Sequence, residues 1–268
     1  GIVGENFRPD AFVDVLRNAS SVMQAGATML TGLSGNIKIP KKTAASAGGW
    51  FTEGNAAAES EMTIGSITMA PKTVGAYTDV TRQLMMQGSP DVEALVRNDL
   101  ASALALAIDL GALTGSGSSG QPTGIRNTSG INTKDFAATT PTFAELVGME
   151  TEVAADNALQ GNLAYILPAA LYGALKTVEK ATNTAQFVVG ADGQINGYRA
   201  IVSNQAAAGD VYFGNFSDLL IGMWGGLDLL VDPYTASTTG TVRVVAMQSV
   251  DVAVRHAVSF CLGDADIA

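Results

Sequence analysis

The chain has 268 residues, of which 47% are hydrophobic and 15% are charged, and its formal net charge is −10. The length is sufficient for one large or two modest domains with a buried core, while the negative charge excludes a protein that holds nucleic acid over its whole surface. A single cysteine and a single histidine exclude an intrachain disulfide and a Cys/His metal cage. No apolar run reaches the roughly 18 residues that span a bilayer, so no membrane contact is predicted. The low charge suggests a surface that other subunits cover.

Residues 1–36 show no strong hydrophobic period. Such a segment cannot build its own core, so we expect it to form an arm that lies along a neighbouring subunit. Its arginines, Arg8 and Arg17, belong with Lys38, Lys41 and Lys42 to a modest basic excess in the first third of the chain. We interpret these charges as solvated or paired between subunits.

An extended run begins at Ile37, and residues 63–82 have the alternation and the Thr, Val and Ile content of strands. A stretch rich in Gly and Ala separates the two. We interpret residues 37–82 as a long two-stranded hairpin with a loose tip. Because an isolated two-stranded ribbon is marginal in water, we expect it to rest on another subunit.

Residues 90–113 predict a helix about 36 Å long, with Ser89 as N-cap and Pro90 at the first helical position. The large apolar residues cover most of the helix surface and leave one narrow polar stripe. We expect this stripe to face solvent or the interior of an assembly. Its members are Asp91, Asn98, Ser102 and Asp109.

The segment after this helix reads GSGSSGQPTG and contains the pattern G-x-G-x-x-G. In a dinucleotide site that pattern follows a strand and opens a helix, whereas here it closes a helix and runs into a proline. We therefore interpret it as a helix stop and a flexible exit loop. The residues expected to permit the turn are Gly115, Gly117, Gly120, Pro122 and Gly124.

The C-terminal half mixes helices and strands, which indicates an α+β layer. Residues 143–157 predict a helix capped by Thr142 and Glu145, and residues 168–182 predict another after a short strand at 164–168. Further strands are expected at 198–202, 211–214, 218–223, 228–231, 242–254 and 257–262.

Common hydrolase, phosphate-loop and zinc signatures are absent from the sequence. His256 with Asp251 and Ser259 does not make a triad, because alternation in a strand turns both partners to the face opposite His256. Cys261 is interpreted as a packed thiol. We expect no enzyme activity, cofactor, metal or small-molecule substrate; an enzyme with a site near residues 190–196 is the alternative that lacks any acid, base or nucleophile cluster.

The order of these features resembles a known family. IKIP enters the hairpin, GGWFTEG lies on its outer limb, TVGAYTDVTRQLM returns, and a long helix leads into GSGSSGQPTGI. This order is similar to that of the major capsid proteins of tailed bacteriophages, whose Hong Kong ninety-seven fold is shared with encapsulins. The resemblance implies an α+β fold with an axial domain built on a mixed sheet flanked by helices. The implied division is an N-arm at 1–36, an E-loop at 37–82, a peripheral domain at 83–123 and 233–268 with the spine helix at 90–113, and an axial domain at 124–232.

The resemblance also implies a function. The chain would be processed to Gly1 from a precursor and would self-assemble, as pentamers and hexamers, into the icosahedral shell of a double-stranded DNA virion in the bacterial host cytoplasm. Portal, scaffolding or cement proteins and a weak contact with packaged DNA are the implied partners. An encapsulin-like compartment is the alternative. Contacts between subunits are expected at Trp50, Phe51, Glu53, Arg8, Arg17 and Arg82.

Overall fold

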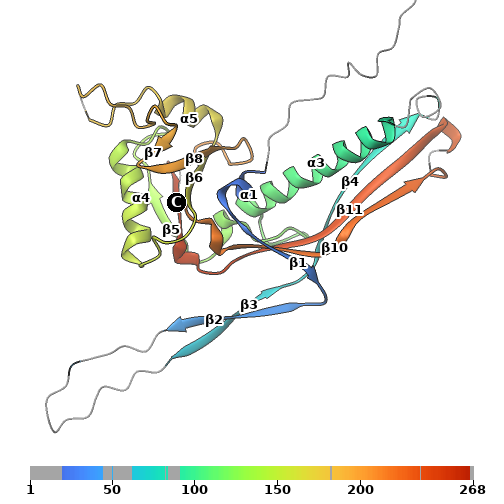
Figure 1. The fold of residues 1–268 in the computed structure, drawn as a ribbon, viewed down its shortest axis with the longest axis horizontal. Coiled ribbons are helices and arrows are strands. Elements are labelled where there is room, and N and C mark those ends of the chain that lie inside the picture. The colour runs from blue at the N-terminus through green and yellow to red at the C-terminus, as the bar shows by residue number, and fades with distance from the viewer. Residues whose placement is uncertain are drawn as a thin grey trace, which may run out of the picture.

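A computed structural model of the chain describes residues 20–44, 62–81, 91–181, 183–235 and 237–265, together with residues 50 and 83. The described elements form a four-stranded sheet under a long helix, a six-stranded sheet flanked by shorter helices, and a two-stranded ribbon that extends from the first sheet (Figure 1). This mixture confirms the α+β class. Within the described ranges, no helix combines the length and apolar character needed to cross a membrane.

The four-stranded sheet has the order β1-β10-β11-β4, with β1 parallel to β10 and the other pairs antiparallel. Its strands are β1 Thr28–Leu33, β4 Lys72–Thr81, β10 Leu219–Asp232 and β11 Thr241–Val254. The sequence predicted two strands where β10 is one. Its register with β11 shifts between Trp224 and Asp228, where Gly225 has a φ of +70°, so the glycine pair bends the strand without ending it.

The long helix α3, Asp91–Thr114, lies across one face of this sheet, in agreement with the predicted helix (Figure 1). Leu100 and Leu104 are buried against Ala246 of β11, and Val74 of β4 packs beside them. These leucines anchor the helix by burying apolar area.

The segment at 21–33 was predicted to lie on a neighbour, and this is wrong. Helix α1, Ser21–Ala25, buries Val22 and Ala25 in the chain's own core, and β1 pairs with β10 of the same chain. A five-residue helix followed by a parallel edge strand shows no hydrophobic period, because each is too short. Residues 1–19 of the predicted arm lie outside the described residues.

The ribbon consists of β2, Ile37–Ala44, and β3, Thr63–Met69, paired antiparallel. The prediction that residues 72–81 continue this hairpin is wrong, because β4 leaves the ribbon after Pro71 and pairs with β11. Only the base of the ribbon is covered by the body. There Met69 is buried with Leu220 and Trp224.

The six-stranded sheet has the order β5-β12-β9-β6-β8-β7. Its strands are β5 Asn132–Asp135, β6 Leu163–Leu167, β7 Gln194–Ile195, β8 Tyr198–Val202, β9 Val211–Asn215 and β12 Phe260–Asp264. Strand β12 lies here, although the implied division gave residues 233–268 to the other domain. Helices α4, Phe143–Ala155, and α5, Ala169–Leu175, accompany this sheet, and α5 is shorter than predicted. Short 3-10 turns occur at Ile125–Asn127, Phe216–Asp218, Ser237–Thr239 and Ala257–Ser259.

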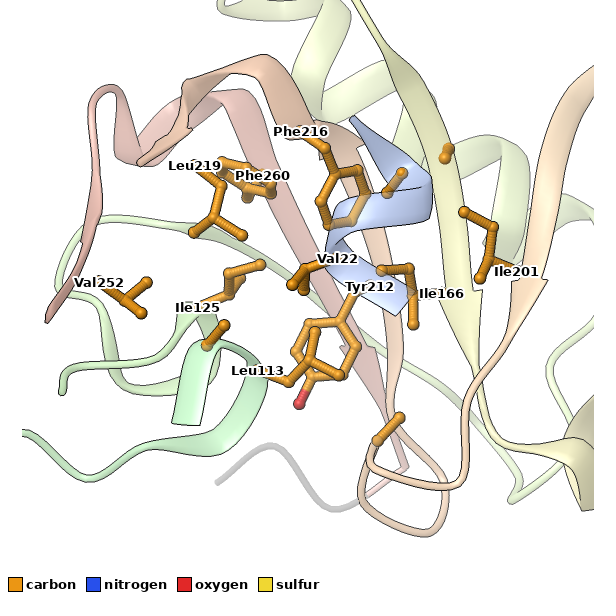
Figure 2. Close-up of a cluster of buried hydrophobic side chains, with 14 of the residues drawn as sticks. Val22, Leu113, Ile125, Ile166, Ile201, Tyr212, Phe216, Leu219, Val252 and Phe260 are labelled. Atoms are coloured by element: carbon orange, nitrogen blue, oxygen red, sulfur yellow. The ribbon is translucent and has the colours of Figure 1, made fainter. Parts of the chain in front are cut away.

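One core joins the two sheets. Figure 2 shows Val22 of α1 and Leu113 of α3 beside Tyr212 of β9, with Ile166 and Val252 on either side. All of these side chains are at most a few per cent exposed. The spine helix therefore ends inside the core that holds the two sheets together.

The start of α4 carries the predicted capping box: Thr142 Oγ1 accepts from the Glu145 amide, and Glu145 Oε2 accepts from the Thr142 amide at 2.7 Å. Partial burial opposes ionisation of Glu145, but these hydrogen bonds and one from the Ala137 amide outweigh it, so its pKa lies below the ordinary value.

We expect Glu145→Gln to lower the free energy of unfolding by about 1 kcal/mol at neutral pH, because it weakens the cap. A carboxylate with a lowered folded-state pKa stabilises the fold above its unfolded pKa and loses that contribution as the pH falls through the folded value. The difference between wild type and variant should therefore shrink below about pH 4. Urea unfolding of wild type and variant at pH 7 and pH 3 measures this difference in the free energy of unfolding. An equal difference at both pH values would contradict a capping role for the ionised Glu145 side chain.

Candidate assembly surfaces

The exit loop from Gly115 to Gly124 is a closed turn. The Gly124 amide donates to Gly115 O at 2.9 Å, the Gly117 amide donates to Pro122 O at 3.0 Å, and Ser116 pairs with Thr123 as an isolated bridge. The predicted glycines and proline are thus brought together in a hydrogen-bonded turn; the flexibility expected of this loop stays a prediction. Gly117 and Gly120 have φ values of +72° and +78°, which the turn requires.

Gly115 has no room for a side chain. A Cβ there would lie 2.3 Å from Pro122 O and 2.4 Å from Gly111 O. Both are backbone atoms, so Gly115→Ala should lower the free energy of unfolding by roughly 2–3 kcal/mol through overpacking. Gly173→Ala in α5 is the matched control, because nothing lies within 4 Å of its Cβ position. Urea unfolding of both variants tests this, and equal midpoints would contradict a crowded turn.

Trp50, in the segment between the two strands of the ribbon, is the most exposed large hydrophobic side chain of the described residues. Its relative exposure is 106%, so it is fully open to solvent in the described structure. Ile64 on β3 is 67% exposed, and Lys38 and Lys42 share its face of the ribbon. Phe51, Glu53, Arg8, Arg17 and Arg82, the other expected contact residues, lie outside the described residues.

A second apolar surface lies on the four-stranded sheet, on the face opposite α3. Tyr77, Val245 and Leu230 are neighbours across β4, β11 and β10, and Tyr77 is 64% exposed. The Arg243 guanidinium lies 4.6 Å from the centre of the Tyr77 ring and binds Asp79 at 2.7 Å. Tyr with Arg is typical of protein interfaces. The sequence analysis missed this surface, although the alternation of Val74 and Ala76 with Tyr77 along β4 could have indicated it.

The polar stripe on α3 does not behave as one surface. Asn98 and Ser102 are exposed, as expected. Asp109 is fully buried, and its carboxylate accepts from Ser21 Oγ at 2.7 Å and from the Val22 amide at 2.9 Å. The expectation that Asp109 faces solvent or an interior space is therefore wrong, because α1 of the same chain covers it. The side chain of Asp91 lies outside the described residues.

Directly after the exit loop, Arg126 joins the loop to two strands of the six-stranded sheet. It pairs with Asp210, which is fully buried, and with Asp264 at 3.2 Å. Tyr212 Oη donates to Asp210 at 2.6 Å. Burial raises the pKa of Asp210 and these hydrogen bonds lower it in part, while the bond to Asp210 raises the pKa of Arg126. The sequence analysis missed this junction, because its members are distant in sequence.

The residues considered for catalysis have structural partners instead. Asp251 accepts from Lys72 Nζ at 2.9 Å, and Ser259 Oγ donates to Asp218 at 2.7 Å, so no triad forms with His256. His256 is exposed and precedes a 3-10 turn, so the strand alternation that the sequence analysis assumed for it is wrong. Cys261 is fully buried as predicted, and burial raises its pKa to about 12.

Residues 192–194 of the segment at 190–196 line an open hollow of about 390 Å³ together with Gln24 and Arg199. Asp192 and Arg199 are its charged lining residues. Among the described residues, no group of three or more His, Cys, Asp or Glu side chains could hold a metal ion.

Comparison with known proteins gives consistent matches over the whole chain. The model of the phage capsid family matches residues 1–265. The major capsid protein of Halomonas phage phiHAP-1 is 33% identical over 267 residues, which is all of this chain and 44% of that protein. The chain thus spans less than half the length of this curated relative.

Solved structures agree in fold. The capsid of a native GTA particle superposes with a TM-score of 0.78 at 20% identity, over 98% of this chain and 96% of that one. A chain of Mycobacterium phage Adephagia superposes with a TM-score of 0.76 at 11% identity, over 98% and 95%.

Proposed function

Because the chain belongs to the phage capsid family, we propose that it is the major capsid protein of a tailed double-stranded DNA phage and self-assembles into a closed icosahedral shell. Its fold is of the Hong Kong ninety-seven type. The shell has no reaction to perform, so the function depends on contacts between copies.

The observation that carries this proposal is the ribbon of β2 and β3 with Trp50 beyond it. An isolated two-stranded ribbon is marginal in water, and a fully exposed tryptophan gains nothing on its own chain. Both features are explained if a neighbouring copy covers them. Obligate interfaces of this kind bury thousands of Å² and are apolar.

We propose that Trp50, Phe51 and Glu53 hold the E-loop on a neighbour, and that Arg8, Arg17 and Arg82 pair across subunits. The division into N-arm, E-loop, peripheral and axial domains is kept in this proposal. Strands β1, β4 and β10 are added to the sheet of the peripheral domain, although the implied division gave residues 124–232 to the axial domain, and β12 is added to the sheet of the axial domain. Pentamers and hexamers of the axial domain would then close the shell.

The contents of the particles test this function against an encapsulin-like compartment, which shares the fold. Particles purified from infected cells should contain genome-length double-stranded DNA, and nuclease protection followed by gel sizing measures it. Particles that carry a peptide-tagged enzyme instead would contradict the proposal. Portal, scaffolding or cement proteins and a weak contact with packaged DNA complete the proposed partners.

A further inference from the structure

Helix α1 is small, but it contacts α3, which covers the four-stranded sheet, and the strands β6 and β8 of the six-stranded sheet. Its two apolar side chains, Val22 and Ala25, are at most 2% exposed and belong to the shared core. In Figure 2, Val22 lies between Leu113 of the spine helix and Ile166 of the six-stranded sheet. Helix α1 therefore lies at the place where the two sheets meet.

The N-terminal end of α1 is hydrogen-bonded to α3, the spine helix. Asp109 Oδ1 accepts from Ser20 Oγ at 3.0 Å and from the Val22 amide at 2.9 Å, and Oδ2 accepts from Ser21 Oγ at 2.7 Å. Three neutral donors thus bind a carboxylate that is fully buried. Losing the acceptor would leave these buried donors unsatisfied, so the three hydrogen bonds attach this end firmly to α3.

The C-terminal end of α1 is bound to the six-stranded sheet. Arg199 of β8 donates to Gln24 O, and Gly26 closes the helix with a φ of +100°. A Cβ on Gly26 would lie 2.5 Å from Asn162 Nδ2, so the chain passes directly against the segment that enters β6. The Ala27 amide donates back to Val22 O at 3.0 Å, which joins this end to the N-terminal end.

We infer that α1 couples the N-terminal segment to the relative position of the two sheets, with Asp109 and Arg199 as the positioning residues at its ends. A five-residue helix has little more than one turn of backbone hydrogen bonds in all, so an opening at one end removes the bonds that hold the other. A pull on the chain at Ser20 is therefore transmitted to both sheets. The next consequence rests on the proposed function. In a shell, a neighbouring subunit that binds the N-terminal segment would act, through α1, on the junction of the two sheets.

Hydrogen exchange of the Val22 and Ala27 amides, measured by NMR on the unassembled chain, tests the coupling. Asp109→Ala should accelerate hydrogen exchange about tenfold or more at the Val22 amide. It should also accelerate exchange at the Ala27 amide, which lies about 8 Å further along the helix axis. Arg199→Ala should likewise accelerate exchange at Val22. Ser102→Ala on the exposed part of the same helix is the control and should change neither amide. The amides of β9 report global stability.

Effects that stay at the mutated end, or no effect at all, would overturn the inference. If Asp109→Ala does not fold, Ser21→Ala removes a single hydrogen bond and should produce the same pattern at both amides with a smaller rate increase. Because exchange is measured without assembly, a chain that never forms shells can still show the coupling. A chain that forms shells can equally fail to show it, so the two proposals are tested separately.

Discussion

Trp50→Ala is expected to abolish shell formation at protein concentrations where the wild type assembles completely. A buried tryptophan at an interface is commonly worth about 2 kcal/mol or more, and a closed shell repeats that contact in every subunit. The free energy of unfolding of the unassembled chain should not change, because Trp50 is 106% exposed and buries no area on its own chain.

Light scattering and negative-stain microscopy measure assembly, and urea unfolding measures the stability of the unassembled subunit. Trp50→Phe is the matched variant and should retain shells, since it keeps an aromatic ring in the proposed contact. Ser102→Ala controls for an exposed substitution elsewhere. Normal shells from Trp50→Ala would show that the ribbon is not held through this side chain.

Arg126→Met is expected to lower the free energy of unfolding by about 3–5 kcal/mol. The substitution leaves the buried carboxylate of Asp210 without its cation, and breaking a buried pair in this way is costly. Burial already raises the pKa of Asp210, and the loss of Arg126 raises it further. A carboxyl group with a raised folded-state pKa destabilises the fold as the pH rises from its unfolded pKa through its folded pKa, so the loss should be largest at neutral pH and smaller in acid.

Arg243→Met is the matched control, because Arg243 also binds an aspartate, Asp79, but at an exposed position. Exposed pairs contribute little, so this variant should unfold close to the wild type. Urea unfolding at pH 7 and pH 4 compares the two. Equal destabilisation by both substitutions would show that the junction at Asp210 is not a buried ion pair of structural importance.

Local sequence patterns were sufficient to predict several of the regular elements. The 24-residue helix α3, the capped helix α4 and strand β8 appear where their patterns placed them. Each has a signal that depends only on neighbours in sequence: a long apolar arc, a Thr-x-x-Glu cap, or a short apolar run between turn residues.

Contacts between distant residues were not predictable in this way. Asp109 was assigned to solvent because the sequence shows its helical face but not that Ser21 covers it, 88 residues earlier. The pairing of β1 with β10 and of β12 with β5 is parallel and long-range, so no hairpin turn signals it. The Arg126 junction likewise unites residues 84 and 138 positions apart. Packing, not local propensity, decides these positions.

The central claim is that this chain completes its fold only among copies of itself. Negative-stain electron microscopy of the purified chain tests it most directly. The account predicts hollow, regular shells, or rings and ribbons of subunits, and loss of both with Trp50→Ala. A stable monomer at all concentrations, with Trp50 protected from solvent by its own chain, would contradict it.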